Sequence, residues 1–259
     1  MSSNTTAKLS CRFFHIRDVS IPKLLEMHQV FSQYYHNADL ATFIKDMSKK
    51  TGVFILKDKR ANRIVGFSTY NEIEIDYRNR KAIGVFSGDT IVEKEFWGNR
   101  SMHKAFAMRM LSTKLKNPTT HVFWLLISKG YKTYLLMTNN FERCYPIAGK
   151  QDEELASLVD QYCTTLYPEA YNAEKRILDF GENYHALKDD VAEITHKMRM
   201  ENRNIRYFDD TNPEWHRGTE LPCVGEISAS TLLGFIRKIF IGNVRLLPRR
   251  KQRANKALA

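Results

Sequence analysis

The sequence predicts a mixed α/β fold in which a mainly antiparallel central sheet is flanked by helices, with a helical C-terminal extension. Two observations carry this prediction. Apolar runs typical of strands alternate with segments whose apolar residues recur at helical spacing, and several strand runs follow one another through short charged turns. Strands joined in that way pair antiparallel. With 259 residues, of which 43% are hydrophobic, the chain is long enough to bury a substantial core.

The first part of the chain predicts one strand followed by two helices. Residues 9–16 are rich in aromatic and apolar side chains, which favours a strand. Pro22 fits the first turn of a helix, where its missing amide costs nothing, and apolar residues then recur at helical spacing through about Tyr35. Asp39 is a predicted N-cap of a second helix that ends near Met47.

Three strand-like runs come next, and we expect them to form an antiparallel meander. The third run contains Gly84 and Gly88. A glycine inside a strand pattern indicates a bulge or a close backbone approach, so the third strand is expected to be irregular. The three runs are residues 53–57, 64–75 and 82–92.

The pattern then changes to a helix that ends at Asn117 and Pro118. Residues 121–127 form a continuous apolar run, which is typical of a central strand buried on both faces. Residues 131–140 favour a helix, although their Thr, Tyr and Leu content also allows a strand. The later chain predicts helices over residues 152–166, 184–198 and 230–241 and a strand over residues 221–227.

Charge and cysteine content exclude several classes of protein. Removing the eight basic residues of the segment 237–259 from the net charge of +11 leaves +3 for residues 1–236, so the excess charge belongs to a tail. Four cysteines lie far apart and without metal-ligand spacing, which predicts reduced thiols and no metal site. A polar N-terminus and the lack of an 18-residue apolar stretch predict a cytoplasmic protein.

Up to about residue 146 the expected order is strand, helix, helix, three strands, helix, strand, helix. This order resembles that of the GCN5-related N-acyltransferase (GNAT) superfamily, whose third meander strand leads through a phosphate-binding loop into a helix. The family's loop motif reads Arg/Gln-x-x-Gly-x-Gly/Ala. The equivalent stretch here is residues 95–100, EFWGNR, in which Gly98 matches while Glu95 and Arg100 depart from the motif.

The resemblance implies a direct transfer of an acyl group from a phosphopantetheine thioester to a small amine. Amides at the start of the helix would hold the donor's pyrophosphate, and Gly98 would allow its close approach. The resemblance implies that the donor is acyl-CoA or an acyl carrier protein thioester, and the departures from the motif favour carrier-protein-dependent relatives that make N-acyl amino acids or acyl-homoserine lactones. The expected donor-binding residues are Gly98, Asn99, Arg100 and Ser101.

In this family a carboxylate on the meander often acts as base, and a tyrosine on the helix after the buried strand often acts as acid. The resemblance therefore points to Glu93 as base and to Tyr131 or Tyr134 as acid. Ser128 and Lys129 do not form a serine nucleophile site, because no His/Asp partner is identifiable. Other possible bases are Glu72, Glu74, Asp76, His36 and His103.

The resemblance covers roughly residues 9–150. We therefore divide the chain into an acyltransferase-like core (1–150), a helical or mixed extension (151–236) and a basic tail (237–259). Basic residues on the helix after the loop offer a docking face for an acidic carrier protein, or an ordinary solvated face. These residues are Lys104, Arg109, Lys114 and Lys116.

A different class of function is also open. The apolar run 232–241 followed by basic residues is typical of an amphipathic segment that rests on an anionic membrane surface, which would make the protein a peripheral binding module. Nucleic-acid binding is supported by the tail's charge but by no motif. A tail that only aids solubility is the remaining alternative.

Overall fold

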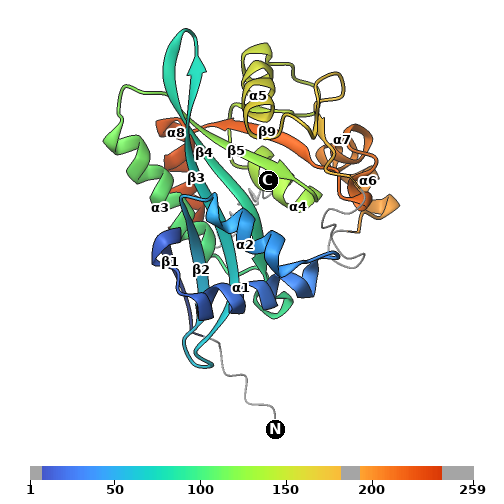
Figure 1. Cartoon of the computed structure of the whole chain (residues 1–259). Coiled ribbons are helices and arrows are strands. Elements are labelled where there is room, and N and C mark those ends of the chain that lie inside the picture. The colour runs from blue at the N-terminus through green and yellow to red at the C-terminus, as the bar shows by residue number, and fades with distance from the viewer. Residues whose placement is uncertain (1–7, 182–192, 241–259) are drawn as a thin grey trace, which may run out of the picture.

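The protein is described here by a computed structural model, which places residues 8–181 and 193–240 (Figure 1). A seven-stranded sheet in the order β1-β2-β3-β4-β5-β9-β6 runs through the molecule. Its strand pairs are antiparallel except for β4 and β5, which are parallel. The predicted fold class, a mainly antiparallel sheet flanked by helices, is confirmed.

The sheet consists of β1 Leu9–His15, β2 Gly52–Asp58, β3 Arg63–Tyr77, β4 Arg80–Val92, β5 Val122–Ser128, β6 Cys144–Tyr145 and β9 Leu221–Glu226. The helices are α1 Ile21–Tyr34, α2 Leu40–Ser48, α3 Ser101–Lys116, α4 Tyr131–Thr138, α5 Glu153–Leu166, α6 His196–Glu201, α7 Arg203–Thr211 and α8 Ala229–Phe240. A small second sheet pairs β7 Tyr171–Asn172 with β8 Ile177–Leu178.

The local signals at the N-terminal helices act as the sequence predicts. Pro22 lies in the first turn of α1. The Asp39 carboxylate accepts a hydrogen bond of 2.7 Å from the Thr42 amide and so caps α2. The β3–β4 hairpin turns through Arg78 and Asn79, whose φ values of 52° and 58° are those of a tight type I′ turn.

Helices cover both faces of the sheet. Alternate residues of β3 point to opposite faces, so Phe67 packs with α1 and α2 and Ile75 packs with α5, while Tyr70 packs with α3 and α4. We call the first side, covered by α1, α2 and α5, the α1 face. The other side, covered by α3, α4, α7 and α8, is the α3 face (Figure 1).

The structure corrects one predicted helix. Residues 184–192 of the expected helix 184–198 lie outside the described residues, and residues 193–195 are not helical. Helix α6 begins at His196 because Thr195 has an extended backbone and its hydroxyl accepts a hydrogen bond from the Met198 amide, 3.3 Å away. The sequence patterns did not predict helix α7, because its two buried residues, Ile205 and Phe208, are too few to make a helical apolar stripe and most of its other residues are polar.

The interval 151–236 contributes one strand to the seven-stranded sheet, next to the edge strand β6. Strand β9, expected over residues 221–227, lies between β5 and β6. The division into core, extension and tail stays a prediction. The tail from residue 241 lies outside the described residues, and no helix within the described ranges is long and apolar enough to cross a membrane.

Candidate active site

Strands β4 and β5 separate toward their C-terminal ends. Their parallel pairing begins at Ile83 and Val122 and ends at Ser87 and Leu126. Beyond that point β4 pairs with β3 alone among the described strands, and β5 continues to pair with β9. Two neighbouring strands of one sheet thus stop pairing with each other, and the backbone groups of such facing edges can pair with an added strand-like ligand.

A bulge in β4 lies where the separation begins. Ser68 pairs with Thr90 and Tyr70 pairs with Ser87, so β4 has one residue more than β3 in this interval. The prediction of an irregular strand at Gly88 is confirmed. The other predicted position, Gly84, keeps its register and is instead a close approach, because an added Cβ would stand 2.6 Å from a Leu125 methyl group.

The loop between β4 and α3 has a glycine turn at the predicted place. Gly98 has a φ of +83°, a conformation that strains residues with a Cβ, and open space surrounds the position where a Cβ would stand. The Asn99 side chain accepts a hydrogen bond of 2.8 Å from the Ser101 amide at the start of α3. The Trp97 indole donates to the Val92 carbonyl, 2.7 Å away, which ties the loop to the end of β4.

Positive side chains gather around this loop. The Lys132 ammonium lies 4.0 Å from the centre of the Trp97 ring, so the start of α4 meets the loop. Burial lowers the pKa of Lys132, and the nearby Lys94 lowers it further. Burial also lowers the pKa of His103, with Arg100 adding to the effect. A bound anion would relieve the repulsion between these positive charges. The sequence patterns did not predict Lys94 or Lys132 as donor-binding residues.

Glu93, the predicted base, is buried and engaged in an ion pair. The Arg63 guanidinium donates to its Oε1, 2.6 Å away. Arg63 begins β3, which lies on the far side of β4 from β5. The second carboxylate oxygen of Glu93, Oε2, is buried and has no hydrogen-bond partner among the described residues. The ion pair thus holds Glu93 toward β3.

The two predicted tyrosines lie in different surroundings. Tyr134 is fully buried against Phe208 and Tyr207 of α7, its hydroxyl has no partner in the described ranges, and burial raises its pKa far above the ordinary value. Tyr131 is the first residue of α4 and is half-buried, which raises its pKa. No hydrogen bond joins either tyrosine to Glu93 within the described part of the chain.

The alternative meander carboxylates are engaged by neighbours. Glu72 accepts hydrogen bonds from Tyr70, from Thr113 at 3.1 Å and from Arg109 at 3.3 Å. Glu74 and Asp76 share the Lys81 ammonium at 2.8 and 3.1 Å. These contacts give each of the three carboxylates a structural partner, so a catalytic role is not needed to explain them.

Two basic residues of the expected carrier-protein docking face make contacts with other residues of the protein. Arg109 binds Tyr70 and Glu72 and covers the Phe13 ring at 4.6 Å. The Lys114 ammonium donates to the Thr120 carbonyl at 2.7 Å. The docking face predicted from four basic residues therefore has fewer charges available than the sequence pattern indicates.

A buried ion pair lies on the α1 face beside the separating strands. Lys129 follows β5 and Glu220 precedes β9. Their Nζ and Oε1 atoms are 3.2 Å apart, and the two side chains are 8% and 4% exposed. Burial raises the pKa of the Glu220 carboxyl, the Lys129 ammonium opposes this rise, and Asp89 adds to it. The Lys129 ammonium also lies 5.1 Å from the centre of the Tyr35 ring.

Sequence reasoning missed this pair because its members are far apart in the chain. The available signal was a lysine directly after a strand expected to be buried on both faces, where an unpaired charge is costly. That signal predicts a partner for Lys129 but does not name Glu220. The Ser128 hydroxyl donates to the Gly130 carbonyl at 2.9 Å, so this serine serves the turn.

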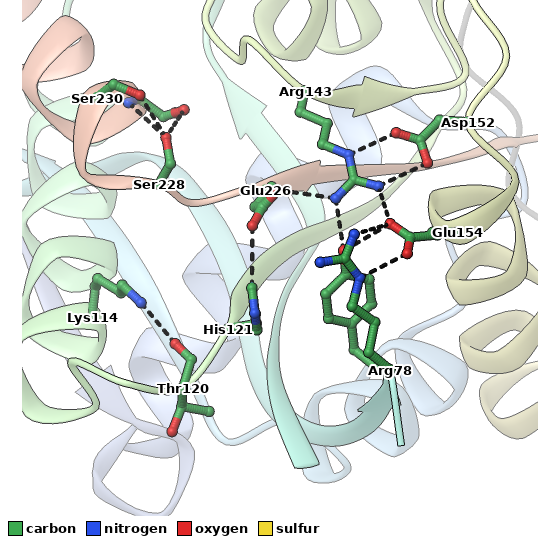
Figure 2. A network of polar contacts seen from close by, with 12 residues as sticks. Arg78, Lys114, Thr120, His121, Arg143, Asp152, Glu154, Glu226, Ser228 and Ser230 are labelled. Atoms are coloured by element: carbon green, nitrogen blue, oxygen red, sulfur yellow. Dashed lines mark hydrogen bonds and ion pairs between the residues drawn. The ribbon is translucent and has the colours of Figure 1, made fainter. Parts of the chain in front are cut away.

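A separate polar network lies at the opposite ends of β4 and β5. Figure 2 shows Arg143 at its centre, donating to Asp152 at 2.7 and 2.9 Å, to Glu154 at 2.6 Å and to Glu226 at 3.2 Å. Arg78 binds Glu154 with two hydrogen bonds of 2.7 Å. Hydrogen bonds donated by Arg143 lower the pKa of Asp152. Hydrogen bonds donated by Arg78 and Arg143 lower the pKa of Glu154 to about 2. This network joins the β3–β4 hairpin, α5 and β9.

Replacing Arg143 with methionine is expected to lower the free energy of unfolding at pH 7 by about 1–2 kcal/mol, because water still reaches the network. A lowered carboxyl pKa stabilises the fold above the ordinary value near 4, and this contribution disappears as the pH falls toward 2. Urea unfolding should thus show a smaller difference at pH 3 than at pH 7. Lys81→Met, which removes an exposed ion pair, is the control with little expected effect. Equal differences at both pH values would contradict this role.

No model of a protein family matches the sequence, and no curated protein matches it. Solved structures are similar to part of the chain. A probable N-acyltransferase from Enterococcus faecalis, of unknown function, is 13% identical with a TM-score of 0.37, over 52% of this chain and 34% of that one. The chain thus spans about a third of that protein.

Two further structures are similar over about half of this chain. A GNAT family N-acetyltransferase from Escherichia coli, in complex with CoA, is 11% identical with a TM-score of 0.38, over 55% of this chain and 73% of that one. Glucosamine-6-phosphate N-acetyltransferase from Arabidopsis thaliana is 12% identical with a TM-score of 0.38, over 56% and 98%. Likenesses this partial do not identify a function.

Proposed function

We propose that this protein is a diverged GNAT acyltransferase that moves an acyl group from a phosphopantetheine thioester to an amine. The observation that carries the proposal is the separation of β4 and β5 beyond Ser87 and Leu126, beside a bulge in β4. A pantetheine arm has amide groups along its length and pairs with an exposed strand edge as an added strand does.

The loop on the α3 face supports the same function. The positive-φ glycine Gly98 leads into the N-terminus of the 16-residue helix α3, where backbone amides and the helix dipole favour a phosphate. Lys94, Arg100 and Lys132 surround this loop, and the repulsion between Lys94 and Lys132 is the kind that a pyrophosphate would remove. Asn99 and Ser101 complete the proposed donor site.

Tyr131 fits the role of the acid better than Tyr134 does. It begins α4 and precedes Lys132, whose ammonium contacts the loop, so a phenol at this position can donate its proton to the leaving thiolate. Tyr134 would need α7 to move. Glu93 stays a predicted base whose carboxylate must first leave Arg63.

The donor's identity is open between acyl-CoA and an acyl carrier protein. The departures at Glu95 and Arg100 favour carrier-protein-dependent relatives that make N-acyl amino acids or acyl-homoserine lactones, and the engagement of Arg109 and Lys114 inside the fold weighs against a carrier docking on that helix face. Attachment of the basic tail to an anionic membrane surface stays a prediction.

The proposal predicts release of free thiol when the protein meets a thioester and an amine. Purified protein is mixed with acetyl-CoA, a long-chain acyl-CoA or an acyl carrier protein thioester, together with a pool of amines, and thiol is titrated with a colorimetric reagent. We expect release that depends on both protein and amine, together with saturable donor binding in calorimetry. Absence of both release and donor binding would refute the proposal.

A further inference from the structure

Strand β3 extends beyond the end of β2 and has an unpaired edge there. The β2–β3 pairing ends where Gly52 faces Tyr70. From Glu72 to Tyr77, β3 pairs with β4 alone among the described strands, and Figure 1 shows the β3–β4 hairpin projecting past β2. The edge of such a strand presents amide and carbonyl groups that an added strand can bind.

The backbone groups of every second residue point out of this edge. The Tyr70 carbonyl accepts a hydrogen bond of 3.1 Å from the residue before β2. Further along β3, the Asp76 amide and carbonyl both bind the Gln161 side chain of α5, at 2.8 and 3.4 Å. Because the direction of these groups alternates along an antiparallel strand, those of Glu72 and Glu74 point out of the same edge. No hydrogen bond from the described residues reaches them on that side.

Gln161 indicates the ligand chemistry that fits this edge. Its side-chain amide accepts a hydrogen bond from the Asp76 amide and donates one to the Asp76 carbonyl. One residue of an added antiparallel strand makes the same two bonds. A peptide backbone would therefore extend to Glu74 and Glu72 the pairing that Gln161 makes at Asp76.

A groove beside the edge offers room for side chains. It has a volume of about 210 Å³ and lies between β3 and α5, on the α1 face of the sheet. Ile73 and Ile75 of β3 point to this face, where they pack with the α5 cluster. The groove is lined by residues 73–76 of β3 and by Gln161, Tyr162, Thr165 and Leu166 of α5. Its aliphatic lining fits the aliphatic side chains of a bound strand.

Acidic side chains line the other face of the same edge. Glu72, Glu74 and Asp76 alternate with the two isoleucines and so point to the α3 face. The Glu74 and Asp76 side chains are 65% and 61% exposed and share the Lys81 ammonium, while Glu72 binds Arg109. Three carboxylates thus meet two cations, which leaves one negative charge in excess.

These charges favour a basic partner over a second copy of this chain. Pairing two β3 edges around a two-fold axis would place the acidic residues of one copy opposite those of the other, and like charges directly opposite each other destabilise a strand pair. A strand with basic residues at alternate positions places opposite charges there instead. Its intervening side chains point to the face that holds the groove.

We propose that the β3 edge between Tyr70 and Asp76 binds an extended segment of a partner protein, in which lysine or arginine alternates with aliphatic residues. The segment runs antiparallel to β3, as β2 does, and its backbone binds Glu72 and Glu74. Its basic side chains meet the acidic face, and its aliphatic side chains enter the groove against α5. This surface is separate from the proposed donor site, because Glu74 pairs with Ile83, at the end of the β4–β5 pairing away from the strand opening.

The first test asks whether the peptide backbone pairs with β3. A fluorescent peptide of about seven alternating lysine and valine residues is titrated with the full-length protein, and anisotropy measures binding. In antiparallel pairing, the lysines opposite Glu72 and Glu74 direct their own amides at β3. N-methylation of the lysine amides should therefore weaken binding at least about ten-fold, and N-methylation of the valine amides should leave it unchanged. Equal binding of the two methylated peptides, or no binding of the parent peptide, would overturn the proposal.

The second test reverses one charge of the edge. Glu74→Lys should weaken binding of the lysine–valine peptide roughly three- to thirty-fold and give binding of a glutamate–valine peptide. The fold should tolerate this change because the ion pair of Glu74 is exposed. Glu201→Lys is the matched control, since Glu201 is a 66% exposed glutamate on α6 and should bind both peptides as the wild type does. Equal loss in both variants would show non-specific charge attraction and overturn the proposal.

Discussion

Replacing Lys129 with methionine is expected to lower the free energy of unfolding by about 3–5 kcal/mol at pH 8, the largest effect on stability that we predict. The reason is Glu220, whose carboxylate would stay buried without its counter-ion. Desolvation of an unpaired charge costs far more than the small net gain of forming the pair. Urea unfolding followed by circular dichroism measures the change.

The loss should depend on pH in a defined direction. Burial holds the pKa of Glu220 above its ordinary value of 4.5, and removing Lys129, which opposes that rise, raises it further. A group whose pKa is raised by folding stabilises the fold below its ordinary value, and this contribution is lost as the pH rises through the folded value. Lys129→Met is therefore expected to lose much less stability at pH 4 than at pH 8.

A double variant provides the control for this prediction. Lys129→Met combined with Glu220→Leu removes both charges and should recover most of the lost stability, since a hydrophobic pair can replace a buried ion pair at little cost. A double variant that is as unstable as the single one would show that lost packing, and not the unpaired carboxylate, causes the effect.

Replacing Gly98 with valine is expected to reduce donor affinity at least about ten-fold. A Cβ at this position meets open space, so the effect arises from the backbone: a φ of +83° costs a residue with a side chain about 1–2 kcal/mol, and a β-branched residue relieves that strain by moving the loop. Calorimetric titration with acetyl-CoA or the acyl carrier thioester measures the change.

Gly181 offers a matched control for the same substitution. It has the same φ of +83° and open space around its Cβ position, but it lies far along the chain from the loop before α3. Gly181→Val should destabilise the fold by a similar amount and leave donor binding unchanged. If both variants bound the donor as the wild type does, the phosphate-binding loop would not be at residues 95–100.

The strands and most helices were predictable because their signals are local. The apolar run 121–127 predicts β5, the Asp39 carboxylate predicts the start of α2, and Gly88 predicts the bulge in β4. Each depends on residues within a few positions of one another. Helix α6 was misplaced and α7 was missed, because α7 is mostly polar and a single hydroxyl, that of Thr195, sets where α6 begins.

The candidate catalytic residues were less predictable. The family resemblance points to Glu93 at the end of the bulged strand and to Tyr131 or Tyr134 on the helix after the buried strand. The sequence does not show that Arg63 pairs with Glu93 or that α7 buries Tyr134, since both contacts join segments far apart in the chain.

The sequence by itself determined a mixed sheet with a bulged strand, followed by a glycine turn into a helix, because alternation, helical spacing and glycine conformation are properties of short segments. Tertiary structure alone decided which charges meet at the strand opening. Asp89, Lys129 and Glu220 come from three different strands or their ends. They converge because β9 inserts beside β5 and the bulge places Gly88 and Asp89 toward the α1 face, and no local pattern records either event.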